Sequence, residues 1–250
     1  MPPASPSQPI PRITTPTPTP GGGTSPGGAT GGRRGTSGPD SLSGTVGADL
    51  IFGLGGPDSI FGLAGNDTIY GGDGDDSILG DADNDLLFGS AGRDSVLGGL
   101  GDDTFYGGKG ADSVSGEDGN DLLFGNQDND TLLGGAGNDT MFGGAGDDSL
   151  LGGIGDDCLS GDRGRDTLTG GVGNDTFAIG READGDVITD FTDVSDRIRL
   201  NAGLTFAQLT ISAGAGTSPS TIIQLTSTKE TLATLLGVAP SAINQADFIF

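Results

Sequence analysis

Aspartate recurs at every ninth position through the middle of this sequence. Sixteen aspartates keep the spacing without a slip, from Asp40 to Asp175. Each follows a glycine by five residues and precedes an apolar residue by two, so three rows of residue types coincide. Carboxylates are hard oxygen ligands of the kind that Ca²⁺ takes, and glycine allows the left-handed turns that bring backbone carbonyls inward. The spacing therefore predicts a repeated calcium site.

The units that follow the pattern most fully read Gly-Gly-x-Gly-x-Asp, as in residues 71–76, 134–139 and 170–175. One such loop supplies fewer than the six to eight oxygens that surround Ca²⁺, so we expect each ion to be shared between two loops. The candidate ligands are the carboxylates of Asp49, Asp58, Asp67, Asp76, Asp85, Asp94, Asp103, Asp112, Asp121, Asp130, Asp139, Asp148, Asp157, Asp166 and Asp175.

Some loops depart from this pattern. Thr36 and Thr45 stand at the second position of the first two loops, and Asp83 and Asp128 replace the glycine at the fourth position. We expect these changes to lower ion occupancy locally and to leave the scaffold intact.

Short strands must position these loops. The residues after each loop form a three-residue run such as Thr140-Met141-Phe142, whose middle side chain points inward because strand side chains alternate. Two nonapeptides then complete a turn of 18 residues, which stacks Asp76 with Asp94 and Asp85 with Asp103. Sixteen loops give two columns with seven gaps each, hence a ceiling of about 14 ions, or roughly +28 of charge. That charge balances the formal net charge of −24.

The composition excludes several classes of protein. The chain has 250 residues, of which 51 are glycine and 32% are hydrophobic. Its acidity argues against nucleic-acid binding, and no apolar run is long enough for a transmembrane helix. It has no histidine and no H-E-x-x-H motif, so we expect no catalytic residues and no enzyme.

The chain divides into three parts. Residues 1–34 are rich in Pro, Thr and Gly and predict a disordered tail. Residues 35–178 carry the repeats and predict a parallel β-roll, a solenoid stacked on calcium. Residues 179–250 lose the period and alternate as strands do, which predicts a small β-rich cap over the last turn of an all-β protein.

The sixteen glycine–aspartate units resemble the repeats-in-toxin (RTX), or hemolysin-type, calcium-binding proteins. The segments 185–191 and 196–200 resemble the tail that follows such repeats. The final Asp247-Phe248-Ile249-Phe250 resembles the uncleaved C-terminal export signal of type I secretion systems. The resemblance implies a protein secreted by a Gram-negative-type bacterium through the type I machinery, which folds outside the cell where calcium is millimolar.

A second row of residues defines a candidate partner face. One aromatic side chain per turn stands at the outer position of alternate strands, and we interpret this row either as packing within the sheet or as a strip that meets a partner. The row consists of Phe52, Tyr70, Phe88, Tyr106, Phe124 and Phe142. The partner would be a second copy of the chain, the cell surface or a matrix.

These observations favour a secreted calcium-binding structural protein of the cell surface or an extracellular matrix. One alternative is an export and folding module associated with an enzyme, because RTX repeats also follow enzyme domains. A calcium-dependent adhesion or ice-binding roll is another, which a ladder of Ser and Thr on the opposite face keeps open.

Overall fold

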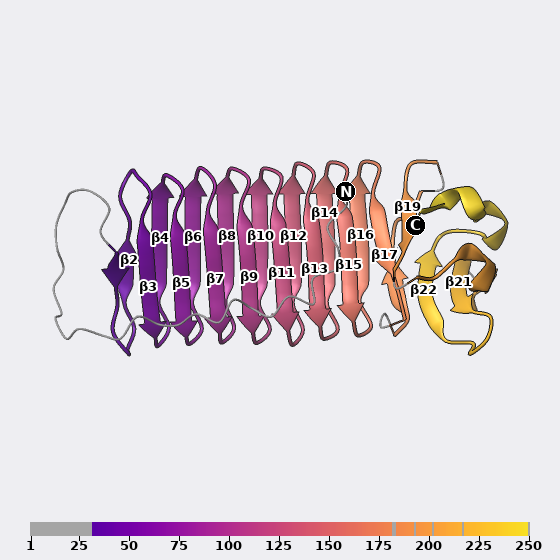
Figure 1. Cartoon of the computed structure of the whole chain (residues 1–250), viewed down its shortest axis with the longest axis horizontal. Helices are drawn as coiled ribbons and strands as arrows, with labels where there is room; N and C mark the ends of the chain where they lie inside the picture. The colour runs from indigo at the N-terminus through magenta and orange to yellow at the C-terminus, as the bar shows by residue number, and fades with distance from the viewer. Residues whose placement is uncertain (1–31, 182–183, 193, 202, 217, 250) are drawn as a thin grey trace.

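The computed structural model describes residues 32–181, 184–192, 194–201, 203–216 and 218–249. Within these ranges the chain forms an all-β parallel solenoid that ends in a small β-rich cap, as the repeat spacing predicts (Figure 1). The tail expected over residues 1–34 lies outside the described residues up to position 31. Residues Arg33–Arg34 form the first strand, so the roll begins at the last two residues of that segment.

Two sheets face each other across the roll, and successive strands alternate between them from β1 to β19. The first sheet contains, in spatial order, β1 (Arg33–Arg34), β3 (Leu50–Gly55), β5 (Thr68–Asp73), β7 (Leu86–Ala91), β9 (Thr104–Lys109), β11 (Leu122–Gln127), β13 (Thr140–Ala145), β15 (Cys158–Arg163), β17 (Thr176–Ile179), β19 (Arg197–Leu200) and β23 (Phe248–Ile249). The second contains β2 (Ser41–Ser43), β4 (Ser59–Ala64), β6 (Ser77–Ala82), β8 (Ser95–Leu100), β10 (Ser113–Asp118), β12 (Thr131–Ala136), β14 (Ser149–Ile154), β16 (Thr167–Val172), β18 (Asp186–Ile188), β22 (Thr231–Leu236), β21 (Ser220–Leu225) and β20 (Leu209–Ala213).

The register between repeat strands is 18 residues, as expected. Leu123 pairs with Met141, and Met141 pairs with Leu159. Most repeat strands are six residues long rather than the three expected. They run on into the glycine loop because loop backbone also pairs with the next turn, as where the Gly56 N–H donates to the Asp73 carbonyl at 2.7 Å.

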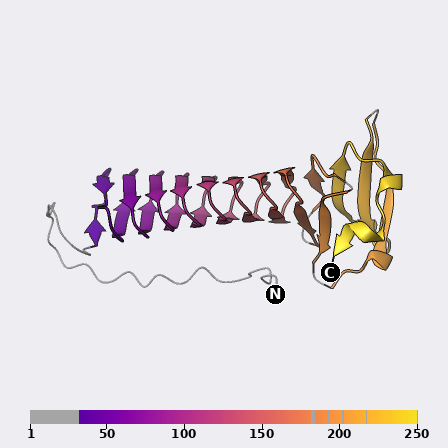
Figure 2. The same cartoon turned by 90° about the horizontal axis from the view of Figure 1, so that it is seen from above.

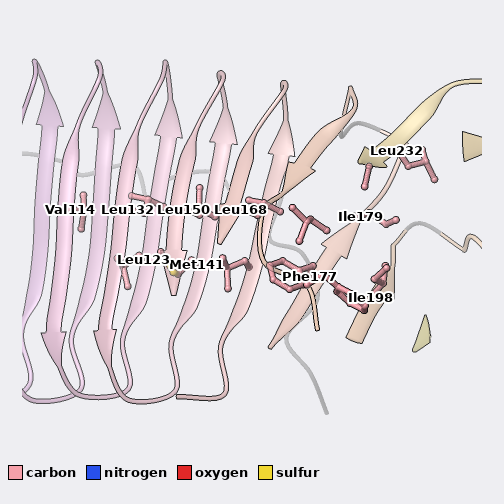
Figure 3. Packing of buried hydrophobic residues seen from close by; sticks show 14 of the residues in the cluster. Val114, Leu123, Leu132, Met141, Leu150, Leu168, Phe177, Ile179, Ile198 and Leu232 are labelled. Atoms are coloured by element: carbon pink, nitrogen blue, oxygen red, sulfur yellow. The ribbon is translucent and has the colours of Figure 1, made fainter. Parts of the chain in front are cut away.

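The core consists of two facing rows of inward side chains, one row from each sheet. The middle residue of each predicted run is fully or almost fully buried from Ile51 to Phe177, and Figure 3 shows Leu123 and Met141 in one row and Leu132 and Leu150 in the other. Burying each such side chain contributes roughly 1.5–3 kcal/mol. A core this narrow leaves little apolar area per residue, so the loops must contribute to stability as well.

The cap continues both sheets and then closes them (Figure 2). β18 and β19 add one parallel strand to each sheet beyond β16 and β17. β20, β21 and β22 form an antiparallel meander, in which β22 pairs with β18. Short 3₁₀ turns at Phe206–Gln208, Pro240–Ala242 and Gln245–Asp247 connect these strands. In the part of the chain that the structure describes, no helix has the length and apolar character to cross a bilayer.

The C-terminal segment compared above with an export signal is part of the cap. Phe248 pairs with Ile198 of β19 and its side chain is buried. Asp247 is also buried, and its carboxylate accepts a hydrogen bond from the Asn244 N–H at 2.7 Å. These residues close the end of the first sheet.

Candidate metal centre

The repeat aspartates form two ladders along the edges of the roll. The main-chain N–H of each aspartate donates to Oδ1 of the aspartate one turn further on, from Asp40 with Asp58 to Asp157 with Asp175, at 2.7–3.0 Å. The predicted stacking of Asp76 with Asp94 is one of these contacts. The backbone therefore fixes Oδ1 of each aspartate from Asp58 to Asp175, while the other oxygen, Oδ2, lies beside the first glycine of its loop.

That other oxygen has no partner. Oδ2 is buried and accepts no hydrogen bond in fourteen aspartates, namely Asp58, Asp67, Asp76, Asp85, Asp94, Asp103, Asp112, Asp121, Asp130, Asp139, Asp148, Asp157, Asp166 and Asp186. A buried carboxylate oxygen without a donor is costly, and proteins resolve that cost with a proton, a cationic side chain or a metal ion. The residues present thus fit a bound cation at each of these loops.

The first glycine of each loop makes room beside this oxygen. A Cβ built on Gly107 would lie 2.7 Å from Oδ2 of Asp112 and 2.8 Å from the carbonyl oxygen of Gly125, one turn further on. Both distances are too short for a real Cβ. Only a hydrogen fits between a carboxylate oxygen of one loop and a carbonyl oxygen of the next, so this glycine keeps an oxygen-lined space open between stacked loops.

Backbone carbonyls and water are the ligands that remain for such an ion. Among the described residues, no three side chains of Asp, Glu, His or Cys group closely enough to hold a metal ion. One carboxylate per loop with carbonyl oxygens around it is a donor set for a hard cation, and Ca²⁺ accepts such mixed oxygen ligands with loose geometry. Transition metals that prefer nitrogen or sulfur ligands have little to bind here.

Burial shifts the titration of these carboxylates. Desolvation raises the pKa of Asp85, Asp94 and Asp148 to about 7 and that of Asp130 to about 8, despite the opposing effect of the backbone hydrogen bond that each accepts. A bound cation reverses this effect, because a positive charge nearby favours the ionised form. Protons and a cation should therefore compete for these carboxylates.

Comparison with known proteins agrees with this geometry. The model of the RTX calcium-binding nonapeptide repeat matches in overlapping windows between residues 34 and 185. The chain belongs to the RTX calcium-binding repeat family. RTX repeats bind calcium through this aspartate pattern, and thirteen of the fourteen unpaired oxygens belong to aspartates of the pattern.

Solved structures with RTX repeats are similar over parts of the chain. Two subunits of a mannuronan C5-epimerase from Azotobacter vinelandii match. The R3 subunit is 30% identical over 49% of this chain and 78% of the subunit, with a TM-score of 0.41. The R2 subunit is 26% identical over 54% of this chain and 91% of the subunit, with a TM-score of 0.35. The extracellular lipase of Serratia marcescens is 20% identical, over 90% of this chain and 40% of the lipase, with a TM-score of 0.39. No curated protein matches.

The first two RTX loops differ from the rest. Thr36 donates its N–H and hydroxyl to Oδ2 of Asp40 at 2.6 and 2.9 Å, and Thr45 does the same for Asp49 at 2.6 and 2.8 Å. The Oδ2 atoms of Asp40 and Asp49 therefore have hydrogen-bond donors, whereas the Oδ2 atoms of the fourteen aspartates named above have none. The Oδ2 of Asp49 thus has two donors in its own loop, and its assignment as a calcium ligand stays a prediction.

The substituted loops keep the RTX backbone, as expected. Asp83 and Asp128 stand where the repeat has its fourth-position glycine, and both have a positive φ of 73°. Asp tolerates this left-handed conformation better than most residues. Their Oδ2 atoms accept hydrogen bonds from Gly65 and Gly110 at 3.0 and 3.1 Å, so these carboxylates are partnered by neighbouring loops.

A third ladder lies outside the candidate ligands and was not predicted. The residue before the repeat aspartate is Asn or Asp in seven consecutive turns along one edge, beginning at Asn66. The last six are joined by hydrogen bonds, because the side-chain oxygen of one residue accepts the N–H of the equivalent residue in the next turn. These residues are Asn84, Asp102, Asn120, Asn138, Asp156 and Asn174. The run is visible in the sequence once its turns are aligned 18 residues apart.

The aromatic row of the candidate partner face is a continuous stack. Neighbouring rings from Phe52 to Phe142 lie 4.6–5.2 Å apart between centroids, with their planes within 4–8° of parallel. The face of each ring therefore contacts the face of the next, and only the ring edges remain for contact with solvent or a partner. Phe88 and Phe142 are buried. The contacts account for the row as packing within the sheet, and a partner there stays a prediction.

Proposed function

We propose that this chain is a secreted structural protein, of the cell surface or an extracellular matrix, whose roll folds when calcium binds outside the cell. The observation that carries the proposal is the set of fourteen buried, unpartnered carboxylate oxygens. At neutral pH and without a cation, those charges oppose folding. With calcium, binding free energy becomes folding free energy, because the unfolded chain holds no preformed site.

The shape of the molecule supports a structural role. The roll offers two long regular sheets and edges that repeat from turn to turn (Figure 1). The sequence has no histidine, and the described repeat aspartates are committed to the ladders. We therefore propose that the chain acts without catalysis.

Calcium titration followed by far-ultraviolet circular dichroism tests this function. We expect strand signal to appear with a midpoint between the submicromolar calcium inside cells and millimolar calcium outside. Magnesium serves as the control ion, because it is smaller and demands octahedral geometry. Strand formation already complete at submicromolar calcium would contradict folding after export. Hydrolase or epimerase activity in the purified secreted chain would contradict a purely structural role.

A further inference from the structure

The outer face of the second sheet carries large apolar side chains that no other part of the described chain covers. Eight of them, on strands β4, β8, β12, β14 and β16, are each more than a third exposed, namely Phe61, Leu63, Leu97, Leu100, Leu133, Leu151, Ile154 and Val172. Among the described residues, the repeat strands of the first sheet hold one such side chain, Leu50. Apolar side chains gathered on one face of a folded protein mark an interaction surface.

These side chains form two rows along the roll. In the row at the third strand position, Phe61 lies next to Leu79, Leu79 next to Leu97, and Leu133 next to Leu151. The second row, at the ends of the same strands, contains Ala64, Ala82, Leu100, Ala136, Ile154 and Val172. Both rows repeat at the spacing of the strands, so the face is regular as well as apolar.

Little charge lies on this face. Among the described residues of β2 to β16 in the second sheet there is no Lys or Arg, and the carboxylates are those of Asp81, Glu117 and Asp118. Basic side chains such as Arg34 and Lys109 belong to strands of the first sheet. A polyanion or an anionic lipid headgroup therefore meets no cation here, and the partner that fits is another uncharged apolar surface.

We propose that this face packs against the same face of a second copy, so that two rolls form a dimer with two-fold symmetry. The seven strands from β4 to β16, about 4.8 Å apart and six residues of about 3.3 Å long, give a face of roughly 700 Å². Covering it on both copies buries roughly 1,400 Å², which lies in the range of stable complexes. A second copy also presents rows with the same repeat. This inference goes beyond the proposed function, because calcium-dependent folding does not require a dimer.

The central strand β10 determines how the two copies are oriented. It is the middle strand of the seven, and it places Ser115 in the third-position row and Asp118 in the row at the strand ends. A two-fold axis along the roll makes facing strands antiparallel, which sets the Ser113 hydroxyl of each copy opposite Glu117 of the other. An axis along the strands would instead bring the two Asp118 carboxylates together. The first arrangement is therefore favoured, and in it Leu133 lies against the partner's Leu133.

The test is the mass of the full chain in millimolar calcium, measured by light scattering. We expect the unmodified chain to be a dimer. The triple variant Leu97→Gln, Leu133→Gln and Leu151→Gln should be a monomer with the same strand signal by circular dichroism, because it removes the apolar row and leaves the buried core unchanged.

The matched control makes the same three replacements on the other sheet. Leu50→Gln, Leu86→Gln and Leu122→Gln alter outward positions of β3, β7 and β11, and this variant should stay dimeric. A folded unmodified chain that is monomeric in calcium would overturn the dimer, and so would a control that loses it. A monomer that binds vesicles of phosphatidylcholine and phosphatidylglycerol would assign the face to a lipid surface instead. In all these outcomes the strand signal tests calcium-dependent folding separately.

Crosslinking tests the interface without the triple variant. In a Cys158→Ala background, a short bismaleimide should join two copies of Leu133→Cys, because these positions face each other. If crosslinks form only when Leu97→Cys and Leu133→Cys chains are mixed, the two-fold axis lies along the strands and the proposed orientation is wrong. If neither combination crosslinks in calcium, the second sheet is not the interface.

Discussion

The N–H of Asp76 donates to Oδ1 of Asp94 at 2.9 Å, whereas Oδ2 of Asp94 is buried and has no donor. The same backbone that forms the sheet thus holds one oxygen of the carboxylate by a hydrogen bond. The other oxygen is buried without a donor, which destabilises the metal-free fold. Each further turn of the roll adds another buried carboxylate oxygen without a donor to each edge. Fold and metal requirement are consequences of one hydrogen-bond pattern.

A single ladder carboxylate should have opposite effects with and without calcium. We predict that Asp94→Asn lowers the stability of the calcium-bound roll by about 2 kcal/mol, the size of a lost charged interaction. In chelator the same variant should keep its strand signal to a higher pH than the unmodified chain, because it removes a buried charge. Urea unfolding measures the effect in calcium, and the pH at which the strand signal disappears measures the effect in chelator. Equal destabilisation in both would show that Asp94 does not bind calcium.

The control for that substitution is Asp102→Asn. Asp102 is exposed and accepts the Asn120 N–H at 2.8 Å on the outer ladder, and an amide oxygen can accept the same bond. Its calcium dependence should match that of the unmodified chain. A shift as large as that of Asp94→Asn would mean that net charge, rather than ligation, controls folding.

The pH dependence of the metal-free chain should run opposite to that of the calcium-bound chain. Burial raises the pKa of Asp94 to about 7 and of Asp130 to about 8, whereas an unfolded Asp titrates near 3.9. A raised folded pKa contributes stability that is complete below about pH 4 and is lost as the pH rises through 7 to 8. In chelator we therefore expect strand signal at acid pH that disappears towards neutrality.

In calcium the strand signal should instead be present at neutral pH and weaken towards acid pH, because the ion binds the ionised carboxylates and competes with protons. Circular dichroism against pH, in chelator and in millimolar calcium, measures both branches. A metal-free chain whose strand content is independent of pH between 4 and 8 would contradict the assignment of these carboxylates.

The first glycine of a repeat loop should be far less replaceable than a glycine with open space around it. Gly107→Ala places a methyl group against Asp112 Oδ2 and the Gly125 carbonyl, and we expect a loss of about 1–3 kcal/mol in calcium together with weaker ion binding. Gly47→Ala is the matched control in a loop, because nothing lies within 4 Å of its added Cβ. If the two variants unfold at the same denaturant concentration, the space beside Asp112 is not needed.

The aromatic stack should act within the sheet. Stacked pairs contribute about 0.5–1.5 kcal/mol each. Replacing Phe88, Tyr106 and Phe124 with Ser should therefore lower the unfolding free energy by several kcal/mol. Oligomer mass by light scattering, with calcium present, distinguishes the other interpretation. A fall in mass with unchanged stability would show that the row is an interface between copies or with a partner.

Much of this fold was predictable from the sequence, because one period governs it. The nine-residue spacing predicts the 18-residue register, the inward row that includes Met141 and the stacking of Asp76 on Asp94. The spacing did not predict that the strands are six residues long. Each strand extends into its glycine loop through backbone pairing, and glycine has no side chain whose alternation would indicate a strand. Residue type alone did not predict which carboxylates lack a donor.

The ends of the ladders show why. Asp49 fits the spacing, yet Thr45 satisfies it; Asp186 breaks the spacing, yet its strand continues the register and leaves its oxygen unpaired. Whether a carboxylate needs a cation depends on donors brought by the three-dimensional path of the chain. A threonine four residues before the aspartate is the sequence signal that marks the satisfied ends.

The most direct test of calcium-dependent folding is the hydrodynamic radius of the chain in chelator at neutral pH, measured alongside its strand signal. We predict an expanded chain with little strand content, which contracts to a compact roll when calcium is added. A chelated chain that keeps the same compact, strand-rich form, with no ion bound, would contradict the account.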